Sequence, residues 1–276
     1  MAASKEIIQK HDEMFYPTVR VRTNKAGGSG TVVYSKKHDD GVHTYVLTNH
    51  HVVADNIKVV KRWNPIQKKK IDTEILDTCS VEFFQFNNHS NCIGSFAVEA
   101  DIIAYSEVEG GQDWCLLRTR DKETTYDYVA NMFPIEDIEN VHIFDKVFAV
   151  GASLGHPPIA SEGMITFMDD EIDHFKYWMS SAQTIYGNSG GACYRWSPHR
   201  KVYEWIGIPS RISVQPSGFS SDAITHMGYF IPIDRVCALL EDNGYEFIYN
   251  SEKTLEECLN KDTDKPIDDS DDSEDE

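Results

Sequence analysis

A serine lies among glycines in residues 187–192, which read Gly-Asn-Ser-Gly-Gly-Ala. Glycine lets the main chain turn sharply and approach a ligand closely, because it has no Cβ atom. A serine exposed at such a turn could act as a nucleophile, and the amides of Gly187 and Ser189 could stabilise an oxyanion about 3 Å away. Asn188 would contribute mainly to the backbone geometry. A serine that lies in a glycine turn by chance would look the same in the sequence. Assigning acyl-transfer chemistry to Ser189 therefore depends on finding a base and an orienting acid elsewhere.

Two adjacent histidines, His50 and His51, follow a predicted strand that ends near Thr48. Either imidazole could act as a general base towards Ser189. Successive side chains of an extended strand point to opposite faces, so we expect only one of the two to reach the serine. The alternative for either histidine is a core or loop residue with a satisfied hydrogen bond.

The orienting acid must be a carboxylate that accepts the other imidazole N–H and stabilises the imidazolium. Asp113 lies between a pair of glycines and the apolar run Trp114–Leu117. A carboxylate at such a place is costly to bury unless it has a partner, which favours Asp113. Asp101 is a second candidate, and an ordinary acid at a strand edge is its alternative explanation.

The composition predicts a globular protein rather than a membrane or fibrous one. The chain has 276 residues, 41% of them hydrophobic, and no apolar run approaches the roughly 18 residues that a membrane helix needs. Charges interrupt the first residues where a secretory signal would have its apolar centre, so we expect a cytoplasmic protein without a membrane partner. Six cysteines lack C-x-x-C pairing, which argues against a zinc ribbon, and we expect free thiols, no metal and no cofactor.

Charge is unevenly distributed along the chain. The formal net charge is -19, and residues 251–276 hold twelve acidic residues against three lysines, a net of -9. Such a segment buries too little apolar surface to order itself, so a disordered acidic tail is expected. The overall charge disfavours nucleic acid as a partner. The one basic stretch, Lys58–Lys70, is interpreted as a solvated loop.

Short β-rich segments separated by turns dominate the sequence and predict an all-β barrel or sandwich architecture. Two sets of six segments suggest two similar barrels. The predicted strands are Thr18–Thr23, Gly30–Ser35, Thr44–Thr48, Val81–Phe86, Asp101–Ser106 and Trp114–Thr119, then Lys146–Gly151, Gly163–Met168, His174–Ser180, Gly191–Arg195, Trp205–Ser213 and Tyr229–Pro232.

Two helices are expected outside the strands, at Ser4–Met14 and at Ile233–Glu241, the latter closing the fold. The predicted organisation is an N-terminal segment over 1–16, a first barrel over 17–125 with His51 and Asp113, a second barrel over 126–250 with Ser189 and the closing helix, and the acidic tail over 251–276.

Four segments together resemble the trypsin-fold (chymotrypsin-like) serine peptidases, and the HtrA-type branch most closely. They are Gly28–Val33, Thr48–Val53, Asp113–Leu117 and Gly187–Gly191, which occur in the order of that family's strand-start, histidine, acid and serine motifs. With weaker similarities between them, the resemblance covers about residues 19–240. It implies two six-stranded antiparallel barrels with the active site in the cleft between them.

The resemblance also implies a catalytic triad of His51, Asp113 and Ser189, with an oxyanion hole at Gly187, Asn188 and Ser189. HtrA-type chains usually carry peptide-binding PDZ modules after the peptidase, and too few residues follow Glu241 for one. His50 replaces a usually small residue, and Ala192-Cys193 replaces the more usual Pro-Leu. Neither departure removes a catalytic group.

Substrate preference is the weakest part of the resemblance. The family pattern implies a primary pocket whose wall is Ile208, Pro209, Ser210 and Arg211 and whose floor lies near Gln183. HtrA-type enzymes favour small or medium apolar side chains in this pocket. Gln183 and Arg211 could instead shift the preference towards polar or acidic side chains, unless Arg211 points to solvent.

A serine endopeptidase acting on protein or peptide substrates is the function that the sequence favours. One alternative is a catalytically silent trypsin-like domain that only binds, since fold does not fix function. Another is a processing peptidase for a single precursor, such as a viral or phage protein. An α/β-hydrolase esterase is disfavoured, because the Gly-x-Ser-x-Gly spacing and the Ser, Asp, His order are missing.

Overall fold

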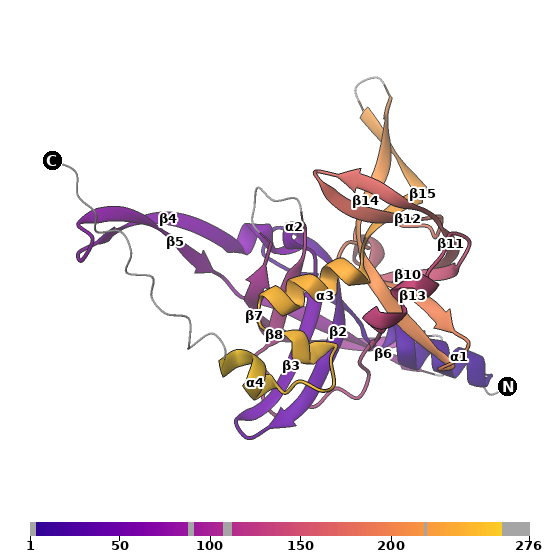
Figure 1. Cartoon of the computed structure of the whole chain (residues 1–276), viewed down its shortest axis with the longest axis horizontal. Helices are drawn as coiled ribbons and strands as arrows, with labels where there is room; N and C mark the ends of the chain where they lie inside the picture. Colours follow the sequence, from indigo (N-terminus) through magenta and orange to yellow (C-terminus); the bar gives the residue numbers. More distant parts are fainter. Residues whose placement is uncertain (1–3, 88–90, 107–111, 218–219, 261–276) are drawn as a thin grey trace. The chain divides into compact units, whose positions relative to one another are not determined.

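The computed structural model describes residues 4–87, 91–106, 112–217 and 220–260 (Figure 1). The chain separates into two compact units, Met1–Val236 and Cys237–Glu276. Every strand that the structure describes lies in the first unit. The expected division near residue 125 therefore separates two parts of one compact unit.

Six strands form the first barrel, which closes in the order β1-β2-β3-β8-β7-β6 with antiparallel neighbours. Alternating β-branched residues, among them Val19, Val21 and Val81, fill its core and are fully buried. The strands are β1 (Thr18–Arg22), β2 (Gly27–His38), β3 (Gly41–Thr48), β6 (Cys79–Asn87), β7 (Asn91–Tyr105) and β8 (Cys115–Thr119).

A second sheet follows the order β13-β10-β11-β12-β15-β14-β9 and becomes ring-like because β13 also pairs with β14. Its strands carry large buried side chains, including Trp205, Tyr194 and Ile165. The strands are β9 (Asn131–Met132), β10 (Lys146–Gly151), β11 (Ile159–Ile172), β12 (Phe175–Ser180), β13 (Ala192–Ser197), β14 (Val202–Ser217) and β15 (Ser220–Pro232).

All twelve predicted strands correspond to strands of these two sheets, and a mostly β fold with a closed six-stranded first barrel is confirmed. The second sheet is ring-like but has seven strands. Two features were not predicted. The two-residue strand β9 joins the second ring by parallel pairing with β14. The other is a separate hairpin within the basic stretch.

The interpretation of Lys58–Lys70 as a solvated loop is wrong. The stretch belongs to a hairpin of β4 (Ile57–Asn64) and β5 (Lys69–Leu76), paired in register from Ile57 with Leu76 to Asn64 with Lys69. In β5 the β-branched residues Ile71, Thr73 and Ile75 alternate with charged residues, and β-branched residues favour extended backbone. The charge run concealed this strand pattern.

Helices are few and short in the first unit. The expected N-terminal helix is present as α1 (Lys5–Lys10), which continues into a π-helical turn, η1 (His11–Phe15). Ser4 caps α1, because its Oγ accepts a hydrogen bond from the amide of Ile7 (3.3 Å). The remaining helical elements are α2 (His50–Val53) and the 3₁₀ turns η2 (Ala54–Asn56), η3 (Ile135–Asn140) and η4 (Ser153–Gly155).

Helix α3 (Ile233–Asp242) agrees with the predicted C-terminal helix and runs across the division between the units. Gly244, at φ +79°, ends it in a left-handed turn. The second unit also contains η5 (Glu246–Ile248) and α4 (Leu255–Asn260). The expectation of a disordered tail is therefore wrong for α4, and residues 261–276 lie outside the described part of the chain. None of the described helices is long and apolar enough to cross a bilayer.

Candidate active site

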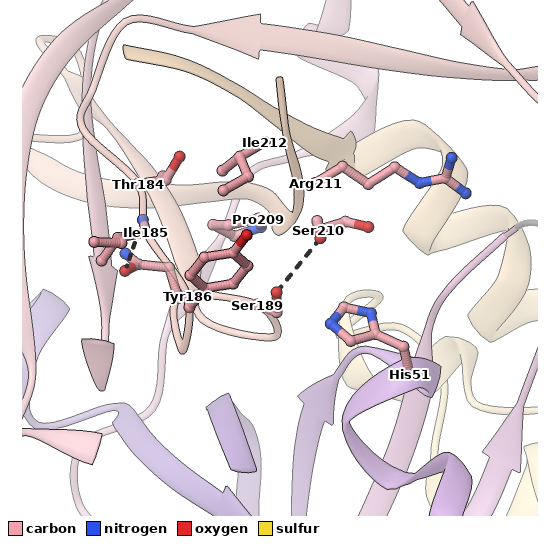
Figure 2. A pocket seen from close by; sticks show the side chains of 10 residues that line it. His51, Thr184, Ile185, Tyr186, Ser189, Pro209, Ser210, Arg211 and Ile212 are labelled. Carbon is pink, nitrogen blue, oxygen red and sulfur yellow. Dashed lines mark hydrogen bonds between the residues drawn. The ribbon is translucent and has the colours of Figure 1, made fainter. Parts of the chain in front are cut away.

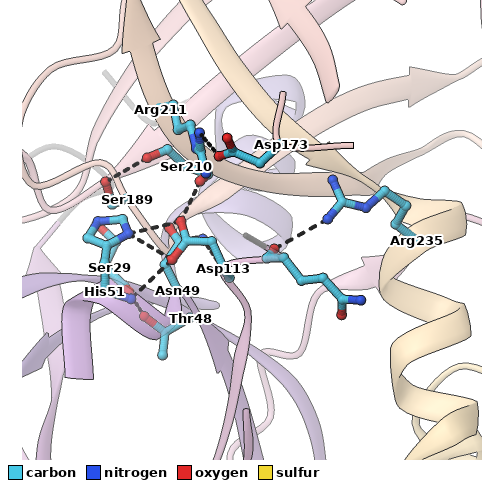
Figure 3. Close-up of polar contacts among 11 residues, drawn as sticks. Ser29, Thr48, Asn49, His51, Asp113, Asp173, Ser189, Ser210, Arg211 and Arg235 are labelled. Atoms are coloured by element: carbon cyan, nitrogen blue, oxygen red, sulfur yellow. Dashed lines mark hydrogen bonds and ion pairs between the residues drawn. The ribbon is translucent and has the colours of Figure 1, made fainter. Parts of the chain in front are cut away.

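His51 is presented by α2, the short helix that follows β3. Its Nδ1 lies 2.9 Å from both Oδ1 and Oδ2 of Asp113, and its amide donates to Oδ1 at 3.0 Å (Figure 3). Asn49, which precedes the helix, donates from Nδ2 to the backbone oxygen of Asp113 at 2.7 Å. The start of α2 and the acid are therefore held together by three donor groups.

The two histidines separate for a different reason from the expected one. They lie in a helix, not at the end of a strand, so alternation along a strand does not apply. The ring of His50 stacks on Tyr105 at a centroid distance of 5.4 Å, while His51 turns to Asp113. Burial lowers the pKa of His50, so its imidazole is neutral at neutral pH.

Asp113 lies just before β8 with a left-handed backbone, φ +56°. Its side chain is only 11% exposed. Burial raises the pKa of Asp113, but hydrogen bonds from His51 and from Ser210 outweigh burial and hold the pKa below its usual range. The hydroxyl of Ser210 donates to Oδ2 at 2.5 Å. The rival acid, Asp101, instead forms an exposed ion pair with Arg120.

Ser189 lies in the turn before β13, between Gly187 at φ +96° and Gly190 at φ +83°. Figure 2 shows its hydroxyl and the ring of His51 facing the same pocket. The hydroxyl donates to the backbone oxygen of Ser210 at 3.4 Å, and no hydrogen bond to His51 is formed within the described residues. A rotation about the Cα–Cβ bond would redirect it, and catalytic hydrogen bonds often tighten only when substrate is bound.

The amides around Ser189 differ in their partners. Those of Asn188 and Gly190 donate to the backbone oxygens of Ile185 and Pro209, both at 3.0 Å. The amides of Gly187 and Ser189 have no acceptor among the described residues, as an oxyanion hole requires. Asn188 is buried and its Oδ1 accepts from Ser153, so its contribution is to the shape of the turn.

A pocket of about 260 Å³ opens beside Ser189 and His51 (Figure 2). Three of the five predicted pocket residues line it, Pro209, Ser210 and Arg211. Sequence reasoning missed the rest of the lining, which comes from the turn before Ser189 and from β14. These residues are Thr184, Ile185, Tyr186, Asn188 and Ile212.

The other two predicted pocket residues lie elsewhere. Gln183 is exposed and lines a neighbouring pocket of about 250 Å³, together with Leu154 and Ser161. Thr184 lines both pockets. Ile208 is fully buried in β14 and lines neither of the two. The path of the chain through the turn directs Gln183 into the neighbouring pocket and away from the pocket beside Ser189. Residue spacing alone does not reveal this direction.

Ser29 of β2 connects the first barrel to the turn that holds Ser189. Its amide donates to the backbone oxygen of Ser189 at 2.7 Å, and its hydroxyl donates to that of Gly187 at 2.6 Å. The same hydroxyl accepts from the amide of Ala152 at 2.7 Å. Ser29 is fully buried. The Gly28–Val33 motif was noticed in the sequence, but this role of its serine was not.

No group of three or more potential metal ligands (His, Cys, Asp or Glu) gathers within the described residues. All six cysteines lie among the described residues, and none of them forms a disulfide.

The sequence matches the family described as trypsin-like peptidase domain over residues 28–198. The matched region is more than half of the chain and includes His51, Asp113 and Ser189. The chain belongs to this family. The resemblance inferred from the four motifs is thereby confirmed, and no PDZ module is present in the described part of this trypsin-like chain. No curated protein sequence matches it.

Solved structures share the fold at low sequence identity. An HtrA-type protease, AlgW, solved with a tripeptide has a TM-score of 0.57 and 17% identity, covering 86% of this chain and 62% of its own. The serine endoprotease from Yersinia pestis has a TM-score of 0.54 and 18% identity, with coverage of 87% and 67%. Deg5 has a TM-score of 0.54 and 17% identity, with coverage of 86% and 94%. This chain therefore spans less than two thirds of the first of these proteins.

We predict that Ser29→Ala destabilises the protein by about 1–3 kcal/mol, because it leaves the buried amide of Ala152 and the oxygen of Gly187 without their shared partner. Chemical denaturation measures this difference. A matched control is Ser80→Ala on β6, which should change the free energy of unfolding by less than about 0.5 kcal/mol. Equal stability of the two variants would show that the Ser29 hydroxyl does not support the turn.

We predict that Ser210→Ala destabilises the protein by about 1.5–3 kcal/mol at neutral pH, since a hydrogen bond to an ionised group is lost. The hydrogen bond lowers the folded-state pKa of Asp113, so its stabilisation exists above the unfolded pKa of about 3.9 and is lost as pH falls through the lower folded value. Denaturation from pH 7 to pH 2 should show the two proteins converging in acid. A difference independent of pH would contradict this coupling.

Proposed function

We propose that this chain is a serine endopeptidase that uses His51, Asp113 and Ser189 as its catalytic triad. The observation that carries the proposal is the position of Nδ1 of His51, which lies 2.9 Å from both carboxylate oxygens of Asp113. The same histidine lines the pocket that holds Ser189. Family membership and the fold of the structural neighbours support a peptidase.

Each group has a distinct role in the proposed reaction. The carboxylate of Asp113 fixes the proton on Nδ1 of His51, which leaves Nε2 as the base. Nε2 takes the proton of Ser189 as Oγ attacks the peptide carbonyl, and returns it to the leaving amine. The same base then takes a proton from water, which attacks the acyl-enzyme and releases Ser189. The amides of Gly187 and Ser189 stabilise the oxyanion, each contributing about 3 kcal/mol.

Cys193 is unsuitable as an alternative nucleophile. It is 1% exposed on β13, and burial raises the pKa of its thiol far above neutral pH. A protonated, enclosed thiol neither attacks a substrate nor reacts with a probe. The hydroxyl of Ser189 is thus the better candidate.

Ser189→Ala and His51→Ala should each reduce peptide hydrolysis on the order of a millionfold while the fold persists, since triad members act as a unit. Release of fluorescence from quenched peptides measures the rate, and circular dichroism checks the fold. A fluorophosphonate probe should label the unaltered chain and Cys193→Ser, but not Ser189→Ala. Labelling that survives in Ser189→Ala would disprove the assignment, and a folded chain with neither labelling nor hydrolysis would favour a silent binding domain.

The pocket supports small or medium aliphatic side chains as the preferred substrate residues. Ile185 and Ile212 contribute apolar surface to it. Arg211 also lines it, but its guanidinium pairs with Asp173 at 2.9 Å and lies 5.3 Å from the ring centroid of Tyr177. The positive charge is thereby balanced before any substrate enters.

This balance predicts that Asp173→Asn shifts the preference towards acidic substrate residues. Without the carboxylate of Asp173, the guanidinium of Arg211 can pair with an acidic substrate side chain instead. This interaction is expected to be worth roughly 1–1.5 kcal/mol, so cleavage after Asp or Glu should improve by about tenfold relative to Val. Profiling with a peptide library measures this ratio. Asp169→Asn is the matched control, because Asp169 on β11 pairs with Lys176 and its loss changes the net charge equally. The same shift in both variants would rule out a specific role for the Arg211 pair.

A further inference from the structure

The β4–β5 hairpin carries concentrated positive charge that the proposed peptidase chemistry does not use. Residues 61–70 contain five basic residues and no acidic one, in a chain of net charge -19. All five are exposed, and none forms an ion pair with another described residue. They are Lys61, Arg62, Lys68, Lys69 and Lys70. Lys58, nearer the base of the hairpin, differs because it pairs with Asp77.

Apolar side chains are exposed among these charges. Ile66 at the tip is 90% exposed, Trp63 is 61% exposed and Val59 is 58% exposed. Asn64 shapes the tip, because its Oδ1 accepts hydrogen bonds from the amides of Ile66 (2.9 Å) and Gln67 (3.1 Å). Residues two apart share a face of a strand, so Val59 and Trp63 point the same way.

The hairpin projects from the first barrel in Figure 1. An eight-residue strand extends about 27 Å, whereas charges in physiological salt are screened over about 8 Å. The basic tip is therefore screened from the net negative charge of the rest of the chain, and the acidic residues of the hairpin, Asp72 and Glu74, lie nearer its base on β5. An anionic surface can attract the tip without repulsion from the net charge of the whole chain.

We propose that the β4–β5 hairpin binds the anionic surface of a lipid bilayer. Trp63 suits the headgroup region, where an aromatic ring with a polar N–H is favoured, and Ile66 suits the acyl boundary. The five cations then face anionic headgroups. This proposal departs from the expectation of no membrane partner, and it does not depend on the peptidase assignment.

The exposed apolar groups favour a bilayer over nucleic acid. Proteins that hold single strands stack bases on aromatic side chains. Trp63 provides one ring for stacking, but Ile66, the most exposed apolar side chain of the hairpin, provides none. In a bilayer the same side chain is removed from water, while the lysines stay at the surface.

Sedimentation of the whole purified chain with lipid vesicles tests the proposal. Vesicles of phosphatidylcholine with phosphatidylserine should retain the protein, and vesicles of phosphatidylcholine alone should not. Binding should weaken as salt rises. The triple variant Lys68→Gln, Lys69→Gln, Lys70→Gln should bind on the order of a hundredfold more weakly, since each basic residue near an anionic surface strengthens binding about fivefold.

A double variant, Trp63→Ser with Ile66→Ser, tests the apolar part and should weaken binding at least tenfold. The charge control is Lys36→Gln, Lys37→Gln, Lys122→Gln, which removes three exposed lysines elsewhere. Phe144→Ser is the apolar control, because Phe144 is 81% exposed outside the hairpin. Both controls should bind as the unaltered chain does, and thermal unfolding checks that every variant is folded.

Three outcomes would overturn the proposal. One is equal retention by vesicles with and without phosphatidylserine, or by neither. Another is equal weakening in the hairpin variants and their controls. The third is retention by a single-stranded oligonucleotide but not by anionic vesicles, which would assign the hairpin to nucleic acid.

Discussion

The burial of one carboxylate, that of Asp113, is the constraint on which the arrangement of the site depends. A charge so enclosed must be compensated by donors, and these come from different parts of the fold. His51 reaches it from the helix after β3, and Ser210 reaches it from β14 of the second ring. Satisfying one charge thus fixes the base relative to the acid and joins the two barrels beside the candidate nucleophile.

A second connection, through Ser29, acts on the nucleophile instead of the base. The backbone of β2 accepts a hydrogen bond from Thr48, just before the His51 helix, and donates one to Ser189. The start of that helix and the serine turn are consequently aligned on the same residue. Neither connection involves a long or flexible side chain, so little conformational entropy opposes them.

The sequence predicted the strands well and singled out the three candidate triad residues, whose roles stay a prediction, because both leave local signals. Alternating apolar residues mark a strand, and His51, Asp113 and Ser189 each lie within a short motif. The hairpin was missed because the lysines of Lys58–Lys70 drew attention from the alternation that follows them in Ile71, Thr73 and Ile75. Gln183 was assigned to the wrong side of its turn, since spacing does not give side-chain direction. The pairing of Arg211 with Asp173 joins residues far apart in sequence, and no local pattern announces it.

The glycines around Ser189 have different physical reasons, although the motif presents them as one pattern. Gly187 adopts φ +96°, which other residues rarely tolerate, and a Cβ atom there would lie 2.7 Å from the amide nitrogen of Leu154. Gly190 also has a positive φ, and a Cβ atom there would lie 2.2 Å from the backbone oxygen of Ser29 on β2. Its glycine is thus required by the approach of β2. A glycine-rich serine turn in this fold is therefore shaped as much by the neighbouring barrel as by the needs of an oxyanion.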